Sequence, residues 1–384
     1  MSPLDDGTAE RLVREHMEAI GEAVSNKVLC VIARRLGVVP QNAGMADVYR
    51  WLAQDLGRID ELFMEGADAI GRQGGRELEA LADEVDRWAA PYYEARGVRQ
   101  AVHDDNVYMQ HILRQSFEAL DHDVANMCRT SAALIVAPDG RYLPLRQAYA
   151  DWATRAVIDM MGGKSRDAVV AKAVEALSGS GLRVRYASGA TRDLYSAVSM
   201  NVSDGFAATM DSLRDRAAVE FGADGVAVSA HAMCAPDHQR VQGRRFTFAE
   251  FDELQATMKR PIGRCNCRHH VTKIVMGVGG GAYDADDRRQ LIEASNREVR
   301  FRDGGRERSM TAYEFTQRQR QMETRCRKLR GAAQVADAGG QRELAERLRG
   351  RASDVADAYR RQSREAGVGT REERLQVYDW SVIS

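Results

Sequence analysis

Histidine and cysteine side chains concentrate in one stretch of the sequence, from Ser229 to His270. This stretch holds four of the eight histidines and three of the six cysteines. Imidazole nitrogens and thiolate sulfurs are the usual ligands of structural Zn²⁺, which takes four ligands in a tetrahedron. Six cysteines in 384 residues do not make a disulfide framework. The clustering therefore points to local chemistry, either a metal site or a nucleophile.

The spacing favours one set of zinc ligands. Cys267 and His269 are one residue apart, so on an extended segment both side chains lie on the same face. His231 and His238 can approach them from the opposite loop. We therefore expect a zinc site of His231, His238, Cys267 and His269 that joins two loops in a weakly apolar region. The alternative is that the histidines are hydrogen-bonded loop residues and the cysteines are small buried groups, since the stretch has no Cys-x-x-Cys pair.

Catalytic interpretations of the same region are weaker. Cys234 or Cys267 beside a histidine could form a nucleophile pair. However, the sequence offers no orienting acid at a known spacing and no oxyanion-hole motif. The segment Gly277–Gly281 lacks the Lys-Ser/Thr that follows a phosphate-binding loop, so a linker is favoured there. We therefore expect no catalytic residues and no cofactor other than the zinc.

A second candidate site is the basic stretch in the last part of the chain. Residues 306–374 carry 17 Lys and Arg against 11 Asp and Glu. The most crowded of these positions are Arg318, Arg320, Arg325, Arg327, Lys328 and Arg330. Their charge suits contact with DNA phosphates or with an acidic partner surface. A solvated helix face stabilised by pairs four residues apart is the alternative, and it is the one we favour.

Composition and charge narrow the class of protein. Apolar residues make up 44% of the chain, and the formal net charge is -1, so no overall field draws it towards DNA or an anionic membrane. No run approaches the roughly 20 apolar residues of a membrane helix. The first residues lack the pattern of a signal peptide. We expect a soluble protein, made in a cytoplasm, with two or three domains.

The first half of the chain should be mostly helical. Apolar residues recur every three or four positions over 12–32, 49–63, 78–88 and 112–124. The glycines between Gly71 and Gly75, and then Pro91, predict breaks between separate helices. Further along, a Pro-Asp-Gly turn within 134–145 predicts a hairpin, Ser165 a helix N-cap and Gly222 the residue after a helix end.

From Gly225 the pattern changes to short strands and loops, and Thr311 begins two charged helices. The fold class predicted is α+β, with a helix-rich N-terminal half, a small mixed α/β domain with short strands and a C-terminal antiparallel helical hairpin. The expected divisions are a helical N-terminal region at 1–140, a central helical region at 141–222, the small mixed domain with the His/Cys stretch at 223–305, and the basic hairpin and tail at 306–384.

Several motifs in this order resemble a known family. The central ones are Ser229-Ala-His231, Pro236-x-His238, Gln242-Gly243 and Asn266-Cys267-Arg268-His269, flanked by Gly181-Leu-x-Val-x-Tyr186 and Tyr313-Glu-x-Thr-Gln317. Over about residues 145–375 the chain resembles the phage minor capsid protein 2 family, which is related in pattern to head-morphogenesis proteins of the Mu F and SPP1 gp7 type. Ala235 stands where the family usually has an arginine, and Cys234 and Cys265 are atypical.

The resemblance implies a structural virion protein of a tailed bacteriophage, acting at or near the portal in head assembly, DNA packaging or ejection. The implied partners are phage portal and capsid proteins and packaged DNA, with no membrane and no small-molecule substrate. The implied location is the virion capsid, after synthesis in the host bacterial cytoplasm. Two alternatives stay open: a transferase or hydrolase domain carried on a phage head protein, and a DNA-binding module that uses the basic helix at 318–330.

Overall fold

The described residues form ten α-helices and nine short strands. The computed structural model describes residues 8–129, 131–186, 188–262, 269–279 and 283–378, with residues 8–16 and 203 described by their backbone alone. The helices are α1 (Thr8–Gly37), α2 (Met45–Arg96), α3 (Val107–Met127), α4 (Leu145–Met161), α5 (Arg166–Ser180), α6 (Leu194–Phe221), α7 (Phe248–Ala256), α8 (Ala285–Asn296), α9 (Ala312–Ala338) and α10 (Arg342–Ala366). Helix accounts for 67% of the structure and the sheets are small and antiparallel, which confirms the predicted α+β class.

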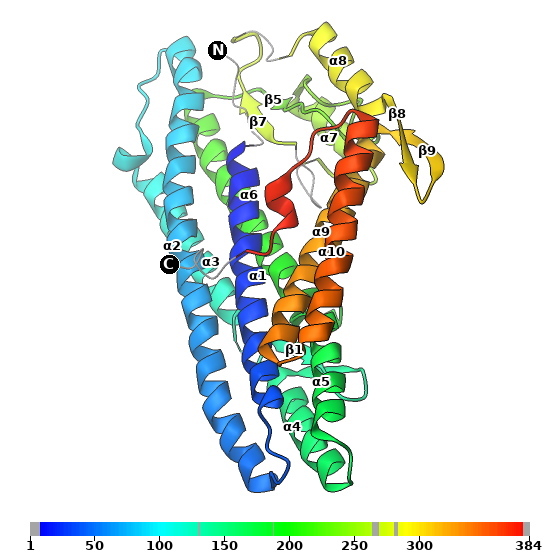
Figure 1. Ribbon diagram of the computed structural model, residues 1–384. Coiled ribbons are helices and arrows are strands. Elements are labelled where there is room, and N and C mark those ends of the chain that lie inside the picture. The colour runs from blue at the N-terminus through cyan, green and yellow to red at the C-terminus, as the bar shows by residue number, and fades with distance from the viewer. Residues whose placement is uncertain (1–7, 130, 187, 263–268, 280–282, 379–384) are drawn as a thin grey trace.

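Helix α1 lies in the middle of an elongated helical bundle (Figure 1). It packs against α2, α5, α6 and α9, and its predicted apolar stripe is buried, with Val24, Val28 and Ile32 fully covered. Burying each such side chain contributes about 1.5–3 kcal/mol. The main apolar core continues from α1 through α2 to α6 and into α9. Among the described residues, no helix combines the length and apolarity that crossing a membrane requires.

Helix α2 is one continuous helix of 52 residues, so the predicted breaks at Gly71–Gly75 and at Pro91 are wrong. The glycines allow α3 to approach closely. A Cβ added at Gly74 would lie 2.6 Å from Leu120 Cδ2, and one added at Gly75 would lie 2.9 Å from Phe117 Cε2. These glycines are therefore packing residues inside a helix whose stability comes from tertiary contacts.

The predicted helix ends and hairpins agree well with the structure. Ser165 caps α5, since its side chain accepts a hydrogen bond from the Ala168 backbone N–H. Gly222 ends α6 in the left-handed conformation, with φ 67°. The Pro-Asp-Gly turn joins strand β1 (Ala133–Val136) to strand β2 (Tyr142–Pro144), and α9 packs antiparallel on α10. Helix α6 begins at Leu194, directly after the short strand β4 at Thr191–Asp193.

Three antiparallel sheets complete the fold. The strands are β1 (Ala133–Val136), β2 (Tyr142–Pro144), β3 (Arg183–Arg185), β4 (Thr191–Asp193), β5 (Gly225–Val228), β6 (Arg245–Thr247), β7 (Val271–Ile274), β8 (Glu298–Asp303) and β9 (Arg306–Thr311). Their orders are β2-β1-β3-β4, β6-β5-β7 and β8-β9. The second sheet lies with α7 and α8 at one end of the bundle (Figure 1), and these two short helices were not predicted.

A testable consequence follows where α1 crosses α6. A Cβ added at Gly21 would lie 2.8 Å from Tyr195 Cα, a backbone atom that cannot move alone. We expect Gly21→Val to lower the free energy of unfolding by about 1–3 kcal/mol, because it forces two packed helices apart. Urea unfolding followed by circular dichroism measures this change.

The matched control is Gly57→Ala, in the exposed interior of α2, where an added Cβ meets nothing within 4 Å. This substitution should raise the free energy of unfolding by about 0.5–1 kcal/mol, because alanine loses less conformational entropy than glycine on entering a helix. Equal effects of Gly21→Val and Gly57→Ala would contradict the close approach of α1 and α6.

Candidate functional site

Sheet register brings together two parts of the His/Cys stretch that lie about forty positions apart in sequence. Strands β5 and β7 pair antiparallel, with Val228 opposite Val271, so the end of β5 meets the start of β7. The pairing continues beyond the strands, because the Ser229 N–H donates to the His270 carbonyl at 3.0 Å and the His270 N–H donates to Ser229 Oγ at 2.9 Å. The loop after β5 is therefore held against the segment before β7.

His231, Cys234 and His269 converge at this junction and are called the His/Cys cluster below. Their ligand atoms all lie within 4.8 Å of one another. Cys234 Sγ lies 3.5 Å from His269 Nε2, and the ring centroids of His231 and His269 are 4.5 Å apart. Cys234 has no exposed surface and His269 is 2% exposed, whereas His231 is half-buried.

Hydrogen bonds determine which nitrogen of His231 carries the proton. Nδ1 lies 2.9 Å from the Ala232 carbonyl oxygen, which can only accept, so Nδ1 is the protonated donor. Nε2 then carries a lone pair, and it is buried without a hydrogen-bond partner among the described residues. A buried acceptor of this kind costs about 1–3 kcal/mol unless a partner is supplied.

Burial keeps the cluster histidines neutral. Burial, together with a smaller effect of the neighbouring histidines, lowers the pKa of His269 to about 3. Burial also lowers the pKa of His231. Because removal from water disfavours the charged form of an imidazole, both rings are neutral at pH 7. Neutral imidazole is the form that binds a metal ion.

Helix α8 supports the loop that carries His231 and Cys234. The Cys234 backbone N–H donates to Ser295 Oγ at 3.2 Å, and Gln239 exchanges amide hydrogen bonds of 3.0 Å with Asn296. Within the loop, Met233 has φ 60°, the one non-glycine positive φ among the described residues. Such a conformation costs of order 1–3 kcal/mol and persists only where surrounding contacts hold it. The loop is therefore built around a strained backbone turn between the two cluster residues.

The structure brings part of the predicted zinc set together. His231 and His269 are in the cluster. His238 lies beside it, with its ring centroid 5.5 Å from that of His269 and its Nε2–H donating to the Arg260 carbonyl at 3.0 Å. Cys267 lies outside the described residues. The predicted set did not include Cys234, although it follows His231 by three positions, a His-x-x-Cys spacing that could have indicated it.

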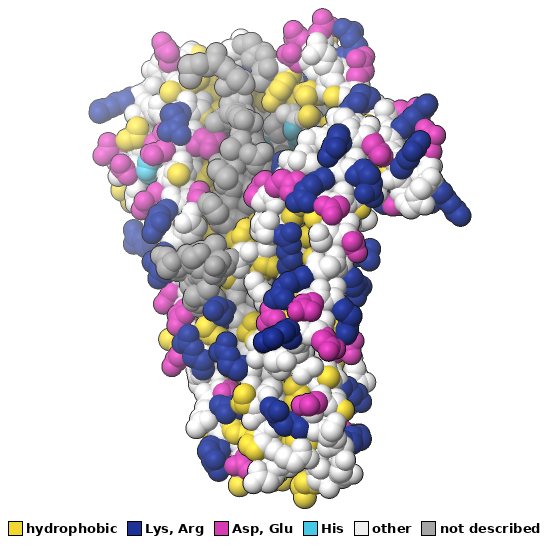
Figure 2. Space-filling model, in the orientation of Figure 1, with side chains coloured by type: hydrophobic (Ala, Val, Ile, Leu, Met, Phe, Trp, Pro, Cys, Tyr) yellow, Lys and Arg dark blue, Asp and Glu magenta, His cyan; other side chains and the backbone are white. Residues whose placement is uncertain are grey.

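The six predicted basic contact residues do not share one face. Four of them bind the chain itself: Arg318 pairs with Asp303, Arg327 pairs with Glu22, Lys328 pairs with Asp193, and Arg330 donates to the Leu375 carbonyl. Arg325 and Lys328 are exposed, whereas Arg320 is half-buried. Along the face of the molecule in Figure 2, Lys and Arg side chains alternate with Asp and Glu side chains.

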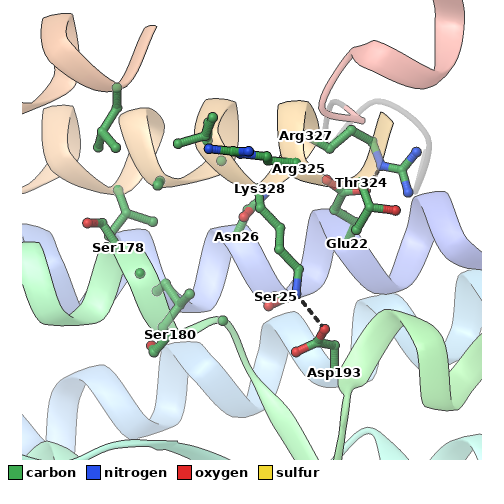
Figure 3. A pocket seen from close by; sticks show the side chains of 18 of the residues that line it. Glu22, Ser25, Asn26, Ser178, Ser180, Asp193, Thr324, Arg325, Arg327 and Lys328 are labelled. Atoms are coloured by element: carbon green, nitrogen blue, oxygen red, sulfur yellow. Dashed lines mark hydrogen bonds and ion pairs between the residues drawn. The ribbon is translucent and has the colours of Figure 1, made fainter. Parts of the chain in front are cut away.

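Arg320, Arg325 and Lys328 line a cavity of about 860 Å³ between α1, α5, α9 and α10. Figure 3 shows Lys328 reaching from α9 towards Asp193, and these residues form an ion pair of 2.8 Å. Glu22 and Arg327 lie farther along the same wall and make an ion pair of 3.2 Å. The cavity is therefore lined by both charges, with part of its basic lining already neutralised.

Glu22 is the most perturbed acid of this cavity. Burial raises the pKa of Glu22 to about 7, and the Arg327 guanidinium lowers it only in part. Both side chains are almost fully buried, at 10% and 7% exposed. Arg327 also donates to the Arg374 carbonyl at 3.0 Å, which fastens the segment after α10 to α9. Arg327 is thus an interior residue.

The cluster and the cavity both fall inside a match to a protein family. The family model for phage minor capsid protein 2 matches residues 10–362, nearly the whole chain. The chain belongs to the phage minor capsid protein 2 family. The match to this capsid protein family begins within α1 and ends within α10, so it extends well beyond the motifs from which the resemblance was identified. No curated protein and no solved structure matches this minor capsid protein.

Family membership makes this minor capsid protein a structural component of phage heads. Its partners are accordingly other phage head proteins. In the capsid protein, Cys234 has no surface through which a substrate could reach its thiol, which donates to the Ala235 carbonyl at 3.3 Å. The His/Cys cluster therefore suits a structural role better than a nucleophilic one.

Proposed function

We propose that this minor capsid protein acts at or near the portal of a tailed-phage head, in head assembly, DNA packaging or ejection. Membership of the capsid family over residues 10–362 carries the proposal. The chain is made in the host bacterial cytoplasm and enters the virion through contacts with portal and capsid proteins. Its elongated bundle offers side surfaces and two distinct ends for such contacts (Figure 1).

Cross-linking of purified virions followed by mass spectrometry tests this location. We expect cross-links from exposed lysines of this chain, such as Lys27 and Lys172, to the portal protein and to few shell subunits. A chain in few copies at the portal should also be far less abundant than the major shell protein. Cross-links to the shell alone, with an abundance close to that of the shell protein, would contradict the portal location.

We further propose a contact surface for DNA or an acidic head protein at the mouth of the cavity, formed by Arg325 and Lys328. Both side chains are exposed, and Arg320 and Arg351 line the same cavity. Cationic side chains at this spacing attract phosphates or carboxylates without reading sequence. Arg318, Arg327 and Arg330 are less exposed and bind other parts of the chain, so they are support residues in this proposal. Lys328 also pairs with Asp193, but its side chain stays exposed.

Charge reversal tests the contact surface. Arg325→Glu/Lys328→Glu should weaken binding to duplex DNA or to purified head proteins by about tenfold or more at low salt, with a smaller loss at high salt. Arg361→Glu/Arg364→Glu on α10 makes the same change in net charge at exposed positions outside the cavity lining. An equal loss in both double variants would show that only net charge matters and would overturn the proposed surface.

A further inference from the structure

We propose that His231, Cys234 and His269 bind a structural Zn²⁺ ion that fastens the loop after β5 to the segment before β7. The proposal is independent of where the protein lies in the phage head. It differs from the set predicted from sequence, because Cys234 is a ligand and His238 is a neighbour. The three side chains come from two segments that the β5–β7 pairing holds together.

The donor atoms have the chemistry that zinc requires. Imidazole nitrogens and thiolate sulfurs are the usual ligands of structural zinc, and a fourth side chain would complete the tetrahedron. The ligand atoms lie within 4.8 Å of one another, and zinc distances of about 2.0–2.3 Å need only small side-chain rotations to close around an ion. On binding, the Cys234 thiol loses its proton to solvent and its sulfur becomes a metal ligand.

The hydrogen bonding of His231 matches that of a metal-binding histidine. Metal-bound histidines donate their second ring N–H to a carbonyl or carboxylate, which fixes the ring and directs the other nitrogen at the metal. His231 Nδ1 makes this hydrogen bond to Ala232, and the buried Nε2 has no hydrogen-bond partner among residues whose placement is described. A Zn²⁺ ion would remove the cost of that buried lone pair.

The surroundings explain why a metal would be useful here. The core of the β6-β5-β7 sheet is small, built on six buried residues: Val226, Val228, Val241, Phe246, Phe251 and Ile262. A core of this size stabilises a long loop only weakly, and small metallodomains commonly add a zinc ion in this situation. The ion would also offset the strained backbone at Met233, which lies between the two ligands of the loop.

Metal analysis of the full-length protein, expressed with Zn²⁺ in the medium and dialysed, tests the proposal. We expect about one zinc per chain in the wild type. Cys234→Ser and His269→Ala should each lose most of it while keeping the helical circular dichroism, since the main core does not include either residue. Cys128→Ala, which removes a buried thiol at the end of α3, should keep its zinc.

Cobalt substitution distinguishes the ligands. Protein loaded with Co²⁺ should show a thiolate-to-cobalt charge-transfer band and the strong visible bands of tetrahedral Co²⁺. The charge-transfer band should vanish in Cys234→Ser and persist in Cys267→Ala. Absence of zinc and cobalt binding in the wild type would overturn the site, and loss of the band in Cys267→Ala with its retention in Cys234→Ser would overturn this ligand set.

Discussion

Arg327→Met should lower the free energy of unfolding by about 3–5 kcal/mol at pH 8. The substitution leaves Glu22 buried without its counter-ion, and it removes the hydrogen bond from Arg327 to the Arg374 carbonyl. Removing one partner of a buried ion pair is costly because the remaining charge stays away from water. Chemical unfolding of the wild type and the variant at several pH values measures the loss.

The pH dependence identifies the cause of this loss. In the folded protein burial raises the pKa of Glu22 from 4.5 to about 7, so the folded state holds a proton that the unfolded state releases. The free energy of unfolding of the wild type therefore falls as pH rises from about 4.5 to 7, by about 3 kcal/mol, and then levels. In Arg327→Met the fall should continue above pH 7, because the guanidinium no longer lowers this pKa.

Glu22→Gln is the control for this titration. Glutamine cannot ionise, so the fall between pH 4.5 and 7 that comes from Glu22 should disappear. The cost of Arg327→Met should also be smaller in the Glu22→Gln background, since no buried charge is left unpaired. If Arg327→Met costs the same at pH 5 and pH 8 in both backgrounds, the ion pair is not the source of its effect.

Asp55→Ala should lower the free energy of unfolding by about 3–4 kcal/mol. Asp55 joins three helices: its carboxylate accepts hydrogen bonds of 2.8 and 2.9 Å from Arg35 of α1 and a further one from Tyr149 of α4. The alanine variant leaves the fully buried Tyr149 hydroxyl without its acceptor. Thermal and urea unfolding of the purified variant measure the effect.

Two milder variants separate the contribution of the Tyr149 hydrogen bond from that of the Asp55 charge. Tyr149→Phe removes the hydroxyl and its hydrogen bond to Asp55 but leaves no buried hydroxyl without a partner. We therefore expect it to lower the free energy of unfolding by about 1–2 kcal/mol. Asp55→Asn keeps an acceptor but loses the charge, so its cost should lie between the other two. A cost below about 1 kcal/mol for Asp55→Ala would show that the three helices do not depend on this carboxylate.

Periodicity predicted the helices well, because each needs one apolar face to pack on a neighbour. The stripe at 12–32 became α1, and the charged segments after Thr311 became the α9–α10 hairpin. Periodicity gave the wrong prediction in α2, where glycines allow close packing instead of ending the helix. The glycines at 74 and 75 read as helix breakers, but in α2 they make room for Leu120 and Phe117, and only the three-dimensional neighbours show this.

The candidate site was predicted in part for a similar reason. Residue type and spacing indicated His231 and His269, but the convergence of Cys234 with them depends on which loops the β5–β7 register brings together. Likewise, the basic residues of α9 look alike in sequence. Arg327 is an interior counter-ion and Arg325 is exposed, and that difference depends on helix α1, some 300 positions away along the chain.

The length of helix α2 sets the distance between the two ends of the bundle. At 1.5 Å per residue its 52 residues extend about 78 Å. The turn before Met45 lies at the α4–α5 end of the bundle, whereas Tyr92 and Tyr93 near the other end pack on Phe221 close to the β6-β5-β7 sheet (Figure 1). Two partners seated on opposite ends would be separated by about 78 Å along this one helix, so its length would set the spacing between them.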